Sequence, residues 1–188
     1  MSFKIVSTLD GLNVLSLADA KKFLRIDHAT SDEDTVITAY INAAVSYCEN
    51  YCSKLFVNRQ VVYSLKNYDD FYFDLNYVSP VTDGVKVRAT VGATHTIVMT
   101  PNDDFVFDLQ PAMIRFINPP TIGENDLNPV QVLVTAGLPP TDNVKQAVRM
   151  LVGHYYEQRN VVVVGSVVST VPMGVDALLN TDRNIRIS

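Results

Sequence analysis

The sequence predicts an α+β fold, in which both ends of the chain form a helical core around a largely antiparallel β-rich middle. Three observations carry this prediction. Apolar residues recur with the 3.6-residue period of an amphipathic helix up to residue 54 and again from residue 141. Between residues 56 and 135 this pattern gives way to short β-branched and aromatic runs separated by turn residues. These runs lie too close together for crossover helices, which favours antiparallel pairing.

The first part of the chain predicts two helices. The first covers residues 17–24 and follows Ser16, which forms a capping-box-like pair with Asp19. The second begins at Ser31 and runs to about residue 52. The acidic residues after Ser31 complement the free amide groups of its first turn.

The two cysteines, Cys48 and Cys52, both fall on the apolar stripe of the second helix. Residues four apart on a helix are poorly placed for a disulfide. We therefore expect two buried thiols, which are compatible with a reducing compartment.

The β-rich middle predicts a series of short strands. They are expected at residues 60–65, 71–75, 85–91, 94–99, 105–109, 113–117 and 130–135. The clearest hairpin joins the third of these runs to the fourth through Gly92 and Ala93.

A long helix is expected over residues 141–160. Pro139 and Pro140 cannot continue a helix from upstream, and Thr141 or Asp142 can accept a hydrogen bond from the first free amides. The start of this helix is therefore marked chemically.

Residues 161–171 form an almost purely β-branched ribbon, with Gly165 and Ser166 placed for a two-residue turn. An uncharged ribbon of this kind would aggregate if it were left exposed, so we expect it to be paired. Either it adds to the protein's own sheet or it docks on a neighbouring subunit. A short final helix is expected to follow.

A chain of 188 residues has room for one domain with a substantial core. We expect a single domain over residues 1–188. Its parts are the N-terminal helices (14–54), the β-rich middle (56–135), the long helix (141–160), the valine-rich hairpin or loop (161–171) and the C-terminal helix and tail (172–188).

The composition excludes several classes of protein. Hydrophobic residues make up 47% of the chain and charged residues 19%, which argues against disorder. A net charge of -5 without a basic cluster argues against a protein that grips nucleic acid through its phosphates. We find no apolar run long enough to span a membrane and no signal-peptide pattern, so we expect a soluble protein made in the cytoplasm.

No constellation of residues points to catalysis, a cofactor or a metal. His154 and Glu157 lie three apart on the long helix, but this pair supplies too few ligands for a zinc or iron site. The acidic residues 32–34 lack the alternating ligands and the glycine of a calcium loop. The glycines are scattered singly, so they form no phosphate-binding loop.

Two segments of the chain carry a resemblance to a known family. The first comprises residues 15–27, the acidic residues 32–34 and residues 41–44; the second comprises residues 132–137, the proline step, and residues 145–147, 154–159 and 172–179. In the order and spacing of these motifs the chain resembles the head-tail connector proteins of tailed double-stranded-DNA bacteriophages, also called adaptor or head-completion proteins.

The resemblance implies a structural protein of the virion neck that is made in the host cytoplasm and is not an enzyme. It would form a ring, expected to hold twelve copies, that joins the portal protein of the DNA-filled head to the tail or to the next neck protein. The ring would extend the DNA channel. DNA would pass through it without specific binding, because an acidic wall repels phosphates.

We expect the subunit and portal interfaces to use the polar face of the long helix, the valine-rich ribbon and the final helix. The residues concerned are Arg149, His154, Glu157, Arg159, Val161, Val162, Val163, Val164, Val167, Val168, Leu178 and Leu179. Two alternatives remain open. One is another neck component, a stopper or a tail terminator, which would show more β structure and fewer paired N-terminal helices. The other is a small cytoplasmic enzyme whose site is built from residues remote in sequence.

Overall fold

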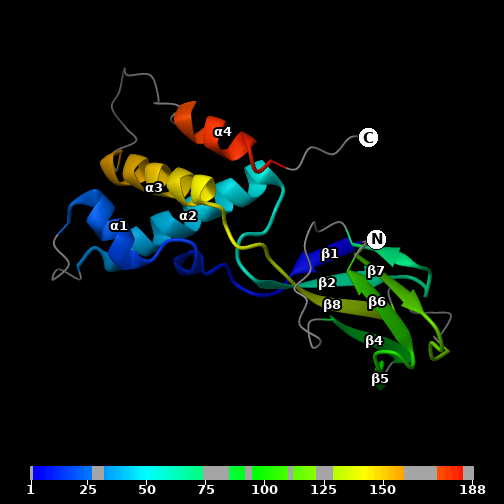
Figure 1. The fold of residues 1–188 in the computed structure, drawn as a ribbon. Helices are drawn as coiled ribbons and strands as arrows, with labels where there is room; N and C mark the ends of the chain where they lie inside the picture. The colour runs from blue at the N-terminus through cyan, green and yellow to red at the C-terminus, as the bar shows by residue number, and fades with distance from the viewer. Residues whose placement is uncertain are drawn as a thin grey trace, which may run out of the picture. The chain divides into compact units, whose positions relative to one another are not determined.

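The structure is a computed structural model that describes residues 2–26, 32–73, 85–91, 95–109, 112–121, 129–158 and 173–183 (Figure 1). The chain divides into two compact units. A β unit consists of Met1–Thr8 and Asn58–Leu138, and a helical unit consists of Leu9–Val57 and Pro139–Ser188. That the two units behave as one domain stays a prediction.

The β unit contains two antiparallel sheets. The larger sheet has the strand order β1-β2-β8-β4-β5, built from β1 (Ser2–Ile5), β2 (Arg59–Leu65), β8 (Val130–Ala136), β4 (Val85–Val91) and β5 (His95–Val98). The smaller sheet has the order β3-β7-β6, built from β3 (Phe71–Tyr72), β7 (Ala112–Phe116) and β6 (Phe105–Leu109). All pairs between these strands are antiparallel, which confirms the predicted middle.

Side-chain alternation and aromatic contacts hold the β unit together. Along β8, Val130, Val132 and Val134 are buried while the residues between them are more exposed, as expected for a strand with one core-facing side. Tyr63 of the larger sheet meets Phe71 of the smaller sheet, with ring centroids 5.0 Å apart. This contact joins the interiors of the two sheets. Aromatic pairs at such distances stabilise a fold beyond the contribution of their burial alone.

The helical unit is built around three helices that lie side by side (Figure 1): α2 (Asp34–Cys52), α3 (Asp142–Glu157) and α4 (Met173–Asn180). The shorter α1 (Leu17–Leu24) contacts both α2 and α3, and the 3-10 helix η1 (Gly11–Asn13) contacts α2. The most deeply buried core side chains include Ile37, Ile41, Val45, Val148, Leu151, Val152, Val175 and Leu179. The predicted α+β class is therefore confirmed.

Two predicted helix starts are confirmed by their caps. The Ser16 hydroxyl accepts a hydrogen bond from the Asp19 amide at 3.1 Å and donates one to the Asp19 carboxylate at 2.7 Å. The Thr141 hydroxyl accepts from the Val144 amide at 3.3 Å. Both contacts satisfy amides that a helix leaves without an internal partner.

The predicted start of the second helix was wrong. Helix α2 begins at Asp34, and Glu33 at its N-cap makes no side-chain capping bond. Instead, Glu33 accepts a hydrogen bond from the Tyr156 hydroxyl of α3 at 2.7 Å, and Asp34 forms an ion pair with Lys21 of α1. These two acidic side chains are thus held by neighbouring helices, which a local capping pattern does not reveal.

Strand β1 was not predicted from the sequence. It pairs with β2, from Ser2 opposite Ser64 to Ile5 opposite Val61. The predicted turn at Gly92 and Ala93, the end of the strand expected at residues 71–75, and the whole ribbon of residues 161–171 lie outside the described residues.

Candidate interaction surfaces

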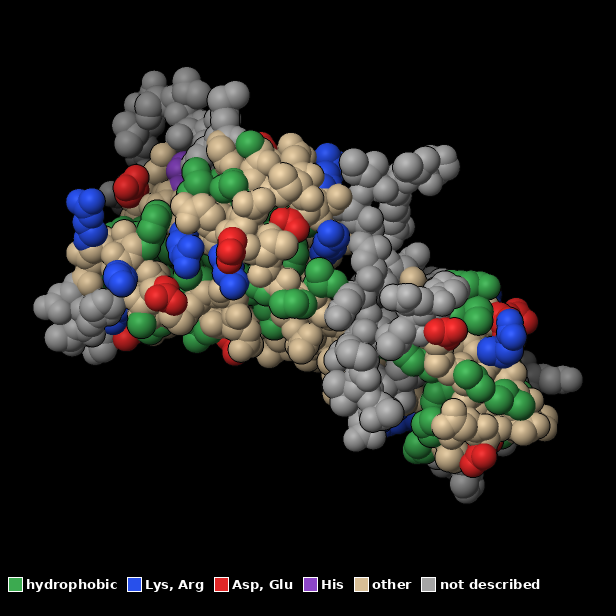
Figure 2. Space-filling view, viewed as in Figure 1, with side chains coloured by type: hydrophobic (Ala, Val, Ile, Leu, Met, Phe, Trp, Pro, Cys, Tyr) green, Lys and Arg blue, Asp and Glu red, His purple; other side chains and the backbone are tan. Residues whose placement is uncertain are grey.

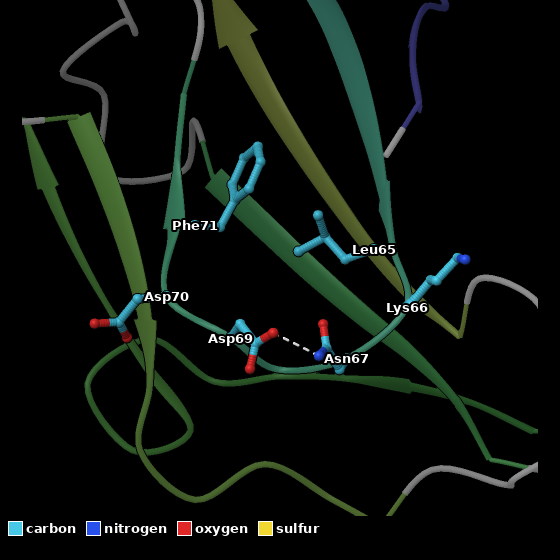
Figure 3. A pocket seen from close by; sticks show the side chains of 6 residues that line it. All are labelled: Leu65, Lys66, Asn67, Asp69, Asp70 and Phe71. Carbon is cyan, nitrogen blue, oxygen red and sulfur yellow. Dashed lines mark hydrogen bonds between the residues drawn. The ribbon is translucent and has the colours of Figure 1, made fainter.

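A shallow pocket in the β unit offers no evident reactive group (Figure 3). It measures about 230 Å³ and is lined by Leu65, Lys66, Asn67, Asp69, Asp70 and Phe71. The two carboxylates already have partners, since Asp69 accepts from the Asn67 amide and Asp70 binds Arg115 at 3.0 Å. Among the described residues, no three His, Cys, Asp or Glu side chains are grouped so that they could hold a metal ion.

The two cysteine thiols lie in the interior of the helical unit, as predicted. Cys48 and Cys52 are free and fully buried. Burial raises the pKa of Cys48 to about 12 and that of Cys52 to about 11. A thiol with such a pKa stays protonated near neutral pH, so neither side chain is an activated nucleophile.

The polar face of α3 carries three of the residues predicted for interfaces. Arg149 and His154 are half-buried, and Glu157 at the end of the helix is exposed. His154 and Glu157 lie one helical turn apart, so they share a face of α3. Arg159 and the valines from Val161 to Val168 lie outside the described residues.

The two leucines predicted for interfaces lie on α4, in different environments. Leu178 is partly exposed, whereas Leu179 is fully buried in the helical core. Side-chain contacts fasten α4 to α2, because Tyr47 donates to Asp176 and Tyr51 donates to Asn180 at 3.0 Å. Leu179 therefore contributes to the interior of this unit, and an interface role for it would require α4 to leave its place.

The outer face of the three-stranded sheet is a surface that the sequence analysis missed. Tyr72 lies opposite Met113, and Val106 lies opposite Arg115. Their alternating neighbours along these strands, such as Phe71 and Phe105, are buried. Tyr72 is 59% exposed, Val106 41% and Ile117 47%. Figure 2 shows hydrophobic side chains gathered on the face of the β unit in view, with charged side chains beside them.

A second exposed apolar site lies on α1. Phe23 is 43% exposed, and the edge of its ring rests against α3 at Gly153, where an added Cβ would lie 3.2 Å from the Phe23 ring. Its neighbours Lys22 and Arg25 are exposed. By contrast, Lys21 is buried and paired with Asp34.

The comparisons with known proteins agree with the resemblance found in the sequence. Residues 14–79, which span α1, α2, β2 and β3, match the family model described as "Phage gp6-like head-tail connector protein". The resemblance is therefore confirmed for this part of the chain. A search of curated proteins gave no match.

Solved structures show the same fold over the whole chain. One is described as the neck of an empty GTA particle computed with C6 symmetry; it has a TM-score of 0.72 and 24% sequence identity, and the match covers 100% of this chain and 98% of that chain. A chain from the virion of the native gene transfer agent particle has a TM-score of 0.71 at 23% identity, with the same coverage. A third, from the neck of the native particle computed with C12 symmetry, has a TM-score of 0.70 at 22% identity, again covering 100% and 98%.

Proposed function

We propose that this chain is a structural protein of the virion neck, which forms a ring that joins the portal vertex of the DNA-filled head to the tail or to the next neck protein. The observation that carries this proposal is the match of residues 14–79 to the gp6-like head-tail connector family. The fold supports it, because chains with this fold occur in solved necks of gene transfer agent particles.

A ring of twelve copies is part of the proposal. The similar chains come from necks computed with C6 and with C12 symmetry, and both symmetries are compatible with twelve subunits. In a closed ring each copy contacts its two neighbours through two different surfaces. The protein thus has three kinds of partner: further copies of itself, the portal protein, and a downstream neck or tail protein.

The proposed role toward DNA is to extend a channel without binding it specifically. The net charge is -5, and the face of the helical unit in Figure 2 carries acidic and basic side chains interspersed. Such a surface offers no continuous basic track for phosphates. A channel wall found to be strongly positive would contradict this part of the proposal.

We assign the predicted interface residues to these contacts. They are the α3 residues Arg149, His154 and Glu157, then Arg159, the valines of residues 161–168, and Leu178 on α4. Leu179 is left out of this assignment because it is fully buried in the core of the helical unit. The proposal gives the protein no reaction to catalyse.

The test is an in vitro head-joining assay with filled heads that lack the neck. The native protein should bind the portal vertex and allow tails to attach. Deletion of residues 165–169 should leave a folded protein that no longer forms rings or docks on the portal, because it removes part of the ribbon that we assign to these contacts. A protein that attaches to isolated tails and not to heads would instead be a tail terminator.

A further inference from the structure

We infer that the outer face of the three-stranded sheet of one copy packs against a patch around Phe23 of the next copy in the ring. The outer sheet face is defined here by Asp70, Tyr72, Val106, Asp108, Met113, Arg115 and Ile117. The α1 patch is defined by Phe23 with Asp19, Lys22 and Arg25 of the first helix and Arg149 and Glu157 of α3. This inference rests on the proposed ring.

The outer sheet face carries exposed apolar side chains on both edge strands, Tyr72 on β3 and Val106 on β6, beside Met113 of the central strand β7. The row Tyr72, Met113 and Asp108 runs across all three strands, since Met113 lies opposite both of the others. In the next row Arg115 lies opposite Val106. A sheet face that leaves a tyrosine, a valine and an isoleucine exposed together has the composition of a protein contact.

The charges of this face leave it acidic. Arg115 is its one cation, and it is already held by Asp70 at 3.0 Å. Asp108 adds a second carboxylate to the face. Two further exposed aspartates, Asp69 and Asp103, lie just before strands β3 and β6. A cationic rim on the partner would therefore complement this face.

The α1 patch has the opposite character. Its centre is the exposed ring of Phe23, which lies against α3 at Gly153. Arg149 lies one turn before Gly153 on the same face of α3. The patch therefore includes a residue that we already assign to the ring contacts.

The charges around Phe23 favour an acidic partner. Lys22, Arg25 and Arg149 outnumber the carboxylates Asp19 and Glu157. Asp19 is moreover engaged by the Ser16 hydroxyl at 2.7 Å.

A second copy of this chain is the occupant that these features fit. Ring closure needs two unlike surfaces on each subunit. The outer sheet face and the α1 patch are unlike, each has an exposed aromatic side chain, and the net charges of their defining residues are opposite. Exposed aromatic anchors inside a polar rim are typical of the residues that dominate binding energy at interfaces.

The experiment is site-specific cross-linking in rings assembled on heads. Three full-length chains are made, each with one added cysteine: Phe23→Cys, Tyr72→Cys and Val98→Cys. Val98 is the matched control, because it is 64% exposed but lies on β5 of the larger sheet. The native chain sets the background, since its two thiols are buried.

A short bismaleimide should link Phe23→Cys to Tyr72→Cys when the two proteins are mixed. Neither protein alone should give this product, and a mixture of Phe23→Cys with Val98→Cys should not give a cross-linked product either. A chain that carries both Phe23→Cys and Tyr72→Cys should give a ladder of linked copies. Rings that form without the cross-link overturn this inference alone, as does a link from Tyr72→Cys to the portal or to a downstream protein. A native chain that forms no ring overturns the proposed function as well.

Charge reversal gives an independent readout. The pair Asp69→Lys and Asp103→Lys, or the pair Lys22→Glu and Arg25→Glu, should each weaken ring assembly about tenfold, because like charges would then face each other. The chain that carries all four substitutions should recover assembly. Failure of this recovery, with all three chains folded, contradicts the pairing of the two surfaces.

Discussion

Glu49 holds the turn that follows α2, and its replacement is the sharpest test of packing in the helical unit. The side chain is only 6% exposed. Its Oε1 accepts hydrogen bonds from the backbone amides of Phe56 at 2.8 Å and Val57 at 3.4 Å. Its backbone carbonyl accepts from the Lys54 amide at 3.1 Å. One residue therefore satisfies several groups where the helix ends.

The size of the effect follows from these bonds. Glu49→Ala leaves two buried amides without their acceptor, and a hydrogen bond to a charged group contributes about 1.5–3 kcal/mol. Because the bond to Val57 is long, we expect a total loss of about 3 kcal/mol in the free energy of unfolding. Glu49→Gln keeps an acceptor oxygen of the same reach but loses the charge, so about half of that loss is expected.

Urea unfolding, followed by the far-UV circular dichroism signal of the helices, measures the free energy of unfolding of both variants. The native chain, Glu49→Gln and Glu49→Ala should fall in that order of stability. The reasoning is refuted if Glu49→Gln is as damaging as Glu49→Ala, or if Glu49→Ala costs less than about 1 kcal/mol.

Three further predictions concern the core, the close packing of Gly137 against the backbone of Asn58, and the two thiols. Leu151→Ala removes a fully buried side chain of α3 and should lower the unfolding free energy by about 3 kcal/mol; a loss below about 1 kcal/mol would contradict its placement in the core. Gly137→Ala should destabilise by about 1–3 kcal/mol in the same assay, because the added Cβ would lie 2.7 Å from the Asn58 backbone; an unchanged midpoint would count against that contact. Cys48 and Cys52 should resist alkylation in the folded protein at about pH 8, since burial raises both pKa values well above that pH, and should react fully in urea; rapid labelling of the native chain would show that the thiols are accessible.

Local chemistry explains why most elements were predictable from the sequence. The observed helix Leu17–Leu24 has the predicted bounds, because the capping pair Ser16 and Asp19 is only three residues apart in sequence. The strand Val85–Val91 was also predicted with the observed bounds. By contrast, the acidic side chains at the start of α2, Glu33 and Asp34, bind Tyr156 and Lys21 of other helices. Partners that are remote in sequence leave no local signal.

The candidate surfaces were less predictable, for the same reason. The alternation along β7 indicates which side of the strand is outward, but only the pairing register shows that Met113 lies beside Tyr72. The burial of Leu179 likewise depends on how α4 lies against α2, which its eight residues do not specify. Of two adjacent leucines on a helix either one can face inward, so the sequence did not show which of the two is buried, and both were predicted as interface residues.

The most direct measurement of the proposed role is electron cryo-microscopy of the intact neck of the particle that carries this protein. The account predicts a closed ring of copies of this chain beneath the portal vertex, around the DNA channel, with a different protein on its other side. Mature particles without this chain, or density for it anywhere other than between the head and the tail, would contradict the account.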